Sequence, residues 1–259
     1  MTKNLLILRA SPDWHAFDIA RSRDFLRPFG LPENLIVEFA ALWSRYFSVD
    51  YCSVRARLKT LALETYNDVR QASLLRHEEW DGRGDPGGWI AFVDDDDWMS
   101  PDLFESLPAA TSGDDGVRWG SMRVGRRFAS NGYGEPIIQR RPLDSIVYTN
   151  NYAVTVGGLD RHGRAAFFEH DAAQRTFDQA GFGLVTSGNY LSCAVKHPCC
   201  TMSVNYLMSL ESFRSDPRRE MSDFMNALDA MRPDDMHEWI RMPFARFREI
   251  MADAIRPRC

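Results

Sequence analysis

Four consecutive aspartates, Asp94 to Asp97, are the residues of this chain whose types and spacing could do chemistry. They directly follow the apolar run 89–93, which is typical of a short buried strand. Ligands of open α/β sheets bind at the carboxyl ends of the strands, where these acids would stand. Four adjacent charges repel one another unless water, bases or a hard cation compensates them. A divalent cation is therefore the expected ligand, and a solvated acidic turn is the alternative.

The elements that must position these acids follow from the pattern of the first hundred residues. Ser100 and Pro101 predict a helix directly after the acids, as its N-cap and first residue. Periodicity does not decide whether 34–42 is a strand or a buried helix, but the alternation of elements favours a strand. The expected elements are strands over 4–8, 34–42 and 89–93, helices over 14–29 and 51–66, and a loop over 78–88. This β-α-β-α-β order predicts a parallel sheet with right-handed crossovers, which can bind a nucleotide at its strand ends.

The second half of the chain changes in composition after Pro108. Its expected strands are 117–124, one bulged or two short strands within 145–156, and edge strands over 182–185 and 190–196. A basic loop is expected over 125–134 and a mobile loop over 157–164. A helix is expected over 169–180, stopped by Gly181, and further helices from 205 onward. We expect the loops over 125–134 and 157–164 to contact an acceptor, because binding variability lies in loops on a rigid sheet.

The overall composition excludes several classes of protein. The formal net charge of −5 argues against a general nucleic-acid binder, which needs a basic surface. Five cysteines, an odd number, do not predict a disulfide framework, so a reducing, cytoplasmic location is expected. The adjacent Cys199 and Cys200 do not form a CxxC pair, which argues against a structural zinc site. The sequence predicts no signal peptide and no transmembrane segment, which would need about 18–20 apolar residues.

Residues 90–102 are similar to the strand-D-x-D-D-W-x-x-P-D segment of the inverting family 2 glycosyltransferases, which have the A-type (GT-A) nucleotide-sugar transferase fold. The resemblance makes Asp94 and Asp96 the DxD carboxylates, which hold a Mn²⁺ or Mg²⁺ that bridges the donor diphosphate. The departing nucleoside diphosphate develops negative charge, and a cation stabilises that charge without proton transfer. The resemblance thus implies a nucleoside-diphosphate sugar as donor, linked to UDP, GDP or dTDP.

A second similarity concerns Glu169-His170-Asp171, followed by Gly181-Phe182. The segment resembles that family's E-D pair, helix and Gly-Tyr. Counting back from the glycine puts His170 at the position of the family's aspartate base. Histidine can take a proton from an acceptor near neutral pH. Asp171 could serve if the helix starts one residue later, so Glu169, His170 and Asp171 all stay candidates for the catalytic base, and their alternative role is to cap the helix.

The remaining parts of the resemblance concern the metal and the nucleotide. Lys196 to Ser203 resembles the closing H-P-x-S-x-S segment of the family, which implies that His197 completes the metal shell or contacts the diphosphate. The nucleotide side has no clear counterpart of the family's base-reading aspartate or its Ala-Arg-Asn segment. Arg57 and Arg9 are the arginines that could reach phosphate there. Expected contacts to the donor are thus Arg9, Arg57, Asp94, Asp95 and Asp96.

Together these features predict an α/β protein with a GT-A-like, Rossmann-type fold, in which helices flank a mixed, mostly parallel sheet. Residues 1–205 would form the transferase domain, with a nucleotide-binding half over 1–107 and an acceptor-binding half over 108–205. Residues 206–259 would form a C-terminal helical extension, which could cap the acceptor site, pair two subunits as a homodimer or touch a membrane.

The predicted function is a metal-dependent glycosyltransferase that acts, with inversion, on a hydroxyl or amine of a small-molecule, saccharide or natural-product acceptor. Two other functions remain open. A nucleotidyltransferase also sets carboxylates and Mg²⁺ at a sheet edge, but its glycine-rich phosphate loop is missing after the first strand, at residues 9–12. The other is a binding module that keeps a metal or carbohydrate site and has lost catalysis. This alternative is favoured by His170, which stands where the family carries its aspartate base.

Overall fold

The computed structural model describes residues 4–9, 33–126, 128, 139–141, 151–168 and 170–258. The chain divides into two compact units, each built from three stretches of sequence. Unit 1 consists of Met1–Ala10, Ala62–Arg123 and Gln139–Ala194, and unit 2 consists of Ser11–Leu61, Val124–Ile138 and Val195–Cys259. In the described residues, no helix is long and apolar enough to cross a membrane. The predicted helix over 14–29 lies outside the described residues.

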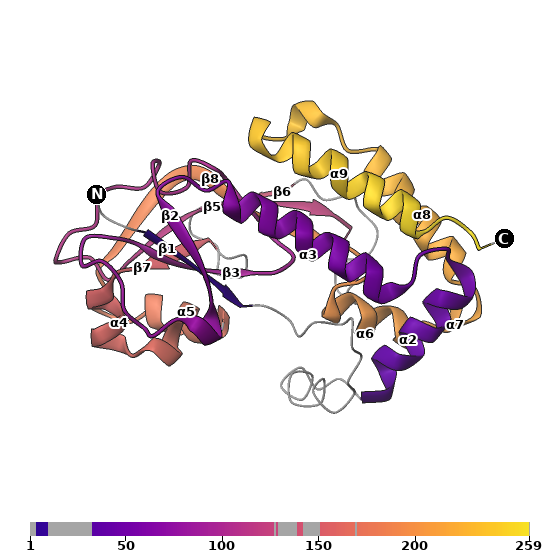
Figure 1. The fold of residues 1–259 in the computed structure, drawn as a ribbon, viewed down its shortest axis with the longest axis horizontal. Helices are drawn as coiled ribbons and strands as arrows, with labels where there is room; N and C mark the ends of the chain where they lie inside the picture. The colour runs from indigo at the N-terminus through magenta and orange to yellow at the C-terminus, as the bar shows by residue number, and fades with distance from the viewer. Residues whose placement is uncertain are drawn as a thin grey trace. The chain divides into compact units, whose positions relative to one another are not determined.

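The strands and helices of the described residues are labelled in Figure 1. The strands are β1 (Asn4–Arg9), β2 (Ala72–Arg76), β3 (Ile90–Asp94), β4 (Trp98–Met99), β5 (Gly116–Gly125), β6 (Gln139–Arg141), β7 (Tyr152–Val154) and β8 (Leu184–Lys196). The α-helices are α2 (Glu33–Tyr46), α3 (Tyr51–Asn67), α4 (Val156–His162), α5 (His170–Phe177), α6 (Thr201–Ser209), α7 (Glu211–Ser215), α8 (Pro217–Asp229) and α9 (Glu238–Ala254). Short 3-10 turns form η2 (His77–Glu79), η3 (Arg164–Phe167) and η4 (Pro233–Asp235).

The sheet has the strand order β2-β1-β3-β7-β5-β8-β4, with β6 paired to β5. Strand β1 runs parallel to both β2 and β3. The pairs β3-β7, β5-β7, β5-β6 and β4-β8 are antiparallel. The predicted α/β class with a mixed sheet is confirmed, but the expectation that the sheet is mostly parallel is wrong for the described strands. Strands β1, β2 and β3, which come first in the sequence, form its parallel part.

The second strand of the sheet is β2, and the prediction of a strand over 34–42 is wrong. That segment belongs to helix α2, because its apolar residues follow helical spacing: Ile36, Phe39 and Trp43 are all buried. The predicted helix over 51–66 is confirmed as α3. The loop expected over 78–88 is confirmed apart from η2, which covers His77–Glu79.

Two other predicted elements have a different form in the structure. No helix follows Ser100 in the described residues, where 101–107 form turns. The two edge strands expected over 182–185 and 190–196 are one long strand, β8, which lies inside the sheet between β5 and β4. The strand over 117–124 is confirmed as β5, and within 145–156 the described residues hold β7.

One face of the unit 1 sheet is covered by α4, η3 and α5, and Figure 1 shows α4 and α5 together below the strands. Buried apolar side chains from these elements pack on residues of β1, β3 and β7. This core contains Leu5, Ile7, Trp80, Ile90, Phe92, Tyr152, Val154, Leu159, Phe167, Ala173 and Phe177. Since the strands carry large apolar side chains on this face, the helices bury their own apolar sides against it.

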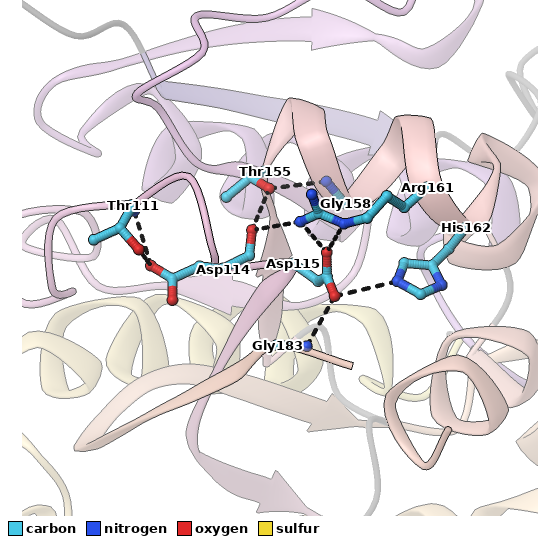
Figure 2. Close-up of polar contacts among 8 residues, drawn as sticks. All are labelled: Thr111, Asp114, Asp115, Thr155, Gly158, Arg161, His162 and Gly183. Carbon is cyan, nitrogen blue, oxygen red and sulfur yellow. Dashed lines mark hydrogen bonds and ion pairs between the residues drawn. The ribbon is translucent and has the colours of Figure 1, made fainter. Parts of the chain in front are cut away.

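Residues 157–164 were predicted to be a mobile acceptor loop, but 157–162 belong to helix α4 and Arg164 begins η3 (Figure 2). Thr155 caps the helix, because its hydroxyl oxygen accepts a hydrogen bond from Gly158 N at 2.9 Å. A Cβ at Gly158 would lie 2.2 Å from the Asp115 carbonyl oxygen. The glycine therefore allows the helix to approach the backbone before β5, and it does not signal flexibility.

Asp115, which is 3% exposed, anchors the other end of α4. Its carboxylate accepts hydrogen bonds from Arg161 Nε and from Gly183 N, the latter at 2.8 Å, and His162 Nε2 lies 3.2 Å from Asp115 Oδ2 (Figure 2). Burial alone would raise the pKa of Asp115, but the hydrogen bonds from Gly183 and Arg161, together with the nearby His162, outweigh burial, so the pKa lies below its usual value. The ionised carboxylate thus stabilises the folded unit.

Asp115→Asn should lower the free energy of unfolding by about 1–2 kcal/mol at pH 7. Because the folded pKa is below the unfolded value of about 3.9, the contribution is present above that value and is lost as the pH falls through the folded pKa. Urea denaturation from pH 7 to pH 3 should show the gap between wild type and variant closing. Asp81→Asn, at a side chain that is 65% exposed, is the control. A gap that does not change with pH would contradict this account.

Unit 2 is built around aromatic side chains of its helices. Phe39 of α2 stacks on Phe213 of α7, with ring centroids 5.7 Å apart and planes inclined by 12°. Phe224 of α8 meets Phe247 of α9 edge to face at 6.4 Å. Helix α2 also packs on α6 and α8. The helices predicted from residue 205 onward are therefore confirmed, and they share a core with α2.

Gly125 ends β5 with a φ of 98°, in the left-handed region. A Cβ there would lie 1.9 Å from the carbonyl oxygen of Lys196. That oxygen accepts a hydrogen bond from Arg126 N at 3.1 Å, so it has little freedom to move away. Gly125 is therefore required both by its backbone conformation and by space.

Gly125→Ala should lower the free energy of unfolding by at least about 2 kcal/mol, measured by urea denaturation. Gly163→Ala is the matched control, because Gly163 has a φ of 81° but no atom within 4 Å of the position that an alanine methyl group would take. That variant should lose only the conformational part, about 1–3 kcal/mol, because residues other than glycine rarely combine a φ of 81° with a ψ of 141°, and it should lose less than Gly125→Ala. Equal losses in the two variants would show that the contact with Lys196 is unimportant.

Candidate functional site

The candidate site lies at the carboxyl ends of the three parallel strands of unit 1. Because β1, β2 and β3 run in one direction, their last residues meet at one edge of the sheet. Arg9 and Asp94 are direct partners in the register of β1 and β3, and Leu8 is the partner of Arg76 in β2. The aspartates 94–97 thus follow a buried strand at the sheet edge, as the sequence predicted.

Arg9 connects two parts of this edge. Its Nε lies 2.9 Å from Asp94 Oδ1, and its Nη1 donates a hydrogen bond to the Phe168 carbonyl oxygen at 2.7 Å. The side chain of Arg9 is 14% exposed, whereas that of Asp94 is 29% exposed. Burial alone would lower the pKa of Arg9, but the charge of Asp94, followed by Tyr152 and the charge of Asp97, outweighs it and raises that pKa. Arg9 is therefore a fixed cation that holds one side of the Asp94 carboxylate.

The four aspartates differ in accessibility. Asp94 ends β3, and Asp95 and Asp96 form the turn that follows. Asp95 and Asp97 are buried, with 7% and 4% of their surface exposed, whereas Asp94 and Asp96 are partly exposed. The alternating pattern leaves the two carboxylates of the D-x-D spacing as the ones that solvent reaches. This is the arrangement that a ligand at the sheet edge requires.

Tyr66, near the end of α3, contacts the backbone of the acidic turn 94–97. Its hydroxyl group contacts two carbonyl oxygens, that of Asp94 at very short range and that of Asp97 at 2.9 Å. Burial, followed by the negative charges of the four aspartates, raises the pKa of Tyr66 well above its usual value. The phenol therefore stays protonated and can donate to the turn.

Tyr66→Phe should lower the free energy of unfolding by about 1–3 kcal/mol, because it keeps the ring but removes the hydroxyl that donates to carbonyl oxygens of the turn. Tyr46→Phe is the matched control: its hydroxyl also donates to a carbonyl, Ser215 O at 2.9 Å, but at an exposed position. That variant should change stability by less than about 0.5 kcal/mol in the same urea titration. Similar losses in both variants would contradict a special role for Tyr66.

The start of α5 is tied to the same edge through backbone carbonyls. Tyr152 of β7 donates a hydrogen bond to the Phe167 carbonyl oxygen at 2.7 Å, next to the Phe168 carbonyl that Arg9 holds. Burial raises the pKa of Tyr152 to about 12, so its hydroxyl remains a donor. Helix α5 begins at His170 and ends at Phe177, before the predicted end at residue 180. Asp94 and the segment that leads into α5 are thus linked through a single arginine.

The three candidate bases are only partly covered by the structure. Glu169 lies outside the described residues, and for His170 and Asp171 only the helical backbone is described. Their assignment as a base stays a prediction. The basic loop predicted over 125–134 is described only at 125, 126 and 128.

Two predicted site residues belong to unit 2. Arg57, on α3, pairs with Asp253 of α9, with Nη1 and Oδ2 2.6 Å apart. His197 follows β8 and is fully buried, and its ring lies 6.2 Å from that of Phe247. Burial, with the charges of Arg55 and Lys196, lowers the pKa of His197 well below its usual value, so the imidazole is neutral. Their roles toward phosphate and metal stay predictions.

Several residues at this edge were not found by sequence reasoning. Tyr66 lies on the apolar face of α3, where its hydroxyl gives no separate signal. Tyr152 has the pattern of an ordinary strand residue. His77, whose ring lies 4.4 Å from that of Phe168, follows a strand that the sequence did not reveal. Only the correct position of β2 would have pointed to His77.

The chemistry that this edge can perform follows from its charges. Two partly exposed carboxylates provide oxygen ligands for a hard cation. Arg9 compensates part of their negative charge, and Tyr66 and Tyr152 fix the backbone on either side. The site can therefore hold a cation at a defined position next to the beginning of a helix, where an anionic ligand would also be stabilised.

Comparison with solved structures finds distant likeness to TarS of S. aureus. TarS 1–349 in complex with UDP-GlcNAc has 11% sequence identity and a TM-score of 0.34, over 96% of this chain and 90% of that one. A second crystal structure of TarS 1–349 has 12% identity and a TM-score of 0.29 over the same shares. No protein-family model and no curated protein matches the sequence. Likeness this distant does not indicate a function, which must be inferred from the residues themselves.

Proposed function

We propose that the protein is a metal-dependent glycosyltransferase that moves a sugar from a nucleoside-diphosphate sugar to an acceptor hydroxyl or amine, with inversion at the anomeric carbon. The observation that carries the proposal is the D-x-D pair Asp94 and Asp96, which is partly exposed at the carboxyl ends of parallel strands, beside Arg9. The resemblance of residues 90–102 to the family 2 segment supports the same function. The acceptor would be a small molecule, a saccharide or a natural product.

The donor set fits a divalent cation. Asp94 and Asp96 offer carboxylate oxygens, which Mn²⁺ and Mg²⁺ prefer, and Arg9 Nε lies against Oδ1 of Asp94. When bound, the cation would neutralise the charge that develops on the departing diphosphate. Arg9 orients the carboxylate of Asp94, and Tyr66 fixes the carbonyls on both sides of the turn. Asp95 would support the donor from within the turn.

The proton of the acceptor needs a base, and the start of α5 is the proposed source. Glu169, His170 and Asp171 stay the three candidates, of which one takes the proton as the new bond forms. The hydrogen bonds from Arg9 and Tyr152 to the carbonyls of Phe168 and Phe167 would hold that helix start in place. The division into residues 1–205 and 206–259, a homodimer through the C-terminal helices, and the donor contact of Arg57 also stay predictions.

A thermal-shift screen of UDP, GDP and dTDP, with and without Mn²⁺, tests donor binding directly. A ligand that binds only the folded state raises the melting temperature, by an amount that grows with its concentration over Kd. We expect one diphosphate to raise it with Mn²⁺ and to have little effect without Mn²⁺. A melting temperature unchanged by all three would contradict the proposal.

Hydrolysis of sugar nucleotides separates the transferase from its alternatives. A transferase without its acceptor should release the nucleoside diphosphate slowly to water when Mn²⁺ is present. A binding module would retain the donor intact, and a nucleotidyltransferase would cleave between the α and β phosphates to give a nucleoside monophosphate. Chromatography of the nucleotide products therefore distinguishes the three.

A further inference from the structure

Arg118 is a charged side chain on β5, a strand that has β7 on one side and β8 on the other. The residue is partly exposed, so a ligand can reach it. Its Nε is shielded from solvent and, within the part of the chain that the structure describes, has no hydrogen-bond partner. In the same residues no carboxylate forms an ion pair with it. Arginines that are withdrawn from water are usually paired, so this guanidinium needs a counter-charge.

The side chain of Arg118 leaves the same face of the sheet as that of Asp94. Arg118 is the direct partner of Tyr152 in the register of β5 and β7, and directly paired residues point to one face. Tyr152 packs on that face in one core with Ile90 and Phe92 of β3. Because side chains alternate along a strand, Asp94 points to the same face as Phe92.

The register also gives the separation between Arg118 and Asp94. Ile90, Val154 and Gly116 form one row across β3, β7 and β5. Since β3 and β5 both run antiparallel to β7, Arg118 lies two strands away from Asp94 and two residues before it. At about 4.8 Å per strand and 3.3 Å per residue, their backbones are about 12 Å apart. Arg118 thus stands beside the proposed donor position, in the half of the chain that we expect to bind the acceptor.

The neighbours of Arg118 on this face of β5 are glycines, and aromatic rings occupy the space above them. A Cβ at Gly116 would lie 2.8 Å from Cε1 of Phe177, and a Cβ at Gly120 would lie 3.0 Å from Cδ1 of Tyr190. Arg118 is therefore the side chain that β5 presents between these two rings. The partly exposed Tyr190 offers a flat apolar surface, and the guanidinium offers a planar set of donors.

We propose that Arg118 binds an anionic group of the acceptor, a carboxylate or a phosphate, and that acceptors with such a group are the preferred substrates. The forked guanidinium can donate two parallel hydrogen bonds to either group. The acceptor then supplies the counter-charge that Arg118 needs, and Tyr190 packs against the carbon skeleton next to the anion. A neutral acceptor leaves the guanidinium without a partner and binds more weakly.

The identity of this ligand as the acceptor rests on the proposed function, whereas the anion site itself does not. Binding of anionic sugars and binding of diphosphates with Mn²⁺ are therefore measured separately. If no diphosphate binds but an anionic sugar binds through Arg118, the proposed function fails and the anion site stands. If a diphosphate binds and no anionic sugar does, only the role of Arg118 is overturned.

A thermal-shift comparison of D-glucuronate, D-glucose 6-phosphate and D-glucose, with the full-length protein, is the test. The three probes share a hexose ring, and only the first two are anionic. At equal concentration and ionic strength, we expect at least one anionic sugar to raise the melting temperature and glucose to leave it unchanged. The larger rise identifies carboxylate or phosphate as the group that is bound. Equal melting temperatures with all three overturn the proposal, as does an equal rise with sodium sulfate.

Arg118→Met removes the donors and keeps an unbranched side chain. It should bind the anionic sugar about 10–100-fold more weakly, the loss expected for hydrogen bonds to a charged group. Arg118→Lys keeps the charge without the fork and should recover only part of the affinity. Arg83→Met is the matched control, since that side chain is 87% exposed, and it should keep the wild-type Kd. Wild-type affinity in Arg118→Met overturns the proposal.

The diphosphate provides a further check on the same variant. Because Arg118 stands beside the donor position, the rise in melting temperature given by a diphosphate with Mn²⁺ should persist in Arg118→Met. Loss of that rise, in a variant that is still folded, would assign Arg118 to the donor and overturn the proposal.

Should Arg118→Met fail to fold, the wild-type protein decides the question alone. Phenylglyoxal modifies accessible guanidinium groups, and a bound anion protects them. At about four times its Kd, the anionic sugar should slow modification of Arg118 about fivefold, measured by mass spectrometry of the peptides. Arg83 is the internal reference and should react at the same rate with and without the sugar. Equal rates at Arg118 with and without the sugar overturn the proposal.

Discussion

Asp94→Asn and Asp96→Asn should each lower the turnover of the sugar-nucleotide donor roughly 10²–10³-fold. Each substitution keeps the shape of the side chain and removes the charge that, in the proposed site, would hold a cation against the donor diphosphate. Asparagine offers one neutral oxygen in place of a carboxylate, and a hard cation binds it much more weakly. The measurement is release of nucleoside diphosphate in Mn²⁺, at donor concentrations that give both kcat and KM.

Asp102→Asn is the control for this pair. Asp102 is 50% exposed, pairs with Arg70 at 2.6 Å, and lies further along the same segment. Asp102→Asn makes the same change in charge at an exposed surface pair. The turnover of this variant should therefore stay within about twofold of wild type. Wild-type turnover in both Asp94→Asn and Asp96→Asn, or turnover that is unchanged in EDTA, would refute the assignment of the metal site.

Arg9→Met should lower kcat roughly 10²-fold with little change in donor KM. The substitution removes the guanidinium that donates to the Phe168 carbonyl and pairs with the Asp94 carboxylate. Asp94 and the segment before α5, the two ends of the proposed site, then lose their fixed position, because Arg9 contacts both. Arg9→Lys should recover only part of the rate, since an ammonium keeps the charge but cannot reach both groups at once.

The same variant also tests the expectation that Arg9 contacts the donor phosphates. A direct contact predicts a rise in donor KM, whereas positioning predicts a fall in kcat. Arg70→Met is the control: its side chain is 60% exposed and pairs with Asp102 and Glu105 at the surface. If Arg9→Met and Arg70→Met have the same kinetics as wild type, Arg9 has neither role.

The acidic edge could be predicted from sequence because both of its signals are local. An apolar run of strand length precedes Asp94, and that run is buried in the structure. Helix α3 was also visible, through the spacing of Val54, Leu58 and Leu61. Such patterns show which side of a strand or helix faces the core, even when the element that packs against it is not known.

The second strand was missed for the opposite reason. The sequence of β2, Ala72–Arg76, has no continuous apolar run, because its residues are only partly buried or exposed and need not be apolar. The run over 34–42 was a stronger signal but belongs to α2, whose Ile36, Phe39 and Trp43 are spaced to line one side of a helix. β2 is held in the sheet by its pairing with β1, which lies between β2 and β3. The paired residues of β1 and β2 are far apart in the sequence, so no local pattern reveals them.

The helix expected after Ser100 is absent because hydrogen bonds to distant backbone groups hold this segment in turns. The Pro101 carbonyl, which a helix would use for its own turn, accepts from Arg70 N at 2.9 Å. Ser100 is also fixed to the sheet, since its N–H, which a helix would leave without a partner, donates to the Leu191 carbonyl of β8 at 2.9 Å. The local capping signal was correct in type, but the tertiary contacts outweigh it.

Unit 2 joins residues that are far apart in the sequence, and this sets the order in which its parts are made during synthesis. The hydroxyl of Ser48 donates to the Pro257 carbonyl at 3.0 Å, across a separation of 209 residues. At a translation rate of about 5–20 residues per second, the ribosome needs roughly 10–40 s to make the intervening chain. For most of that interval α2 lacks the cover that α6, α7 and α8 provide. Helix α2 therefore stays without this cover until the residues after Ala194 have been made, whereas unit 1 is complete in sequence at Ala194.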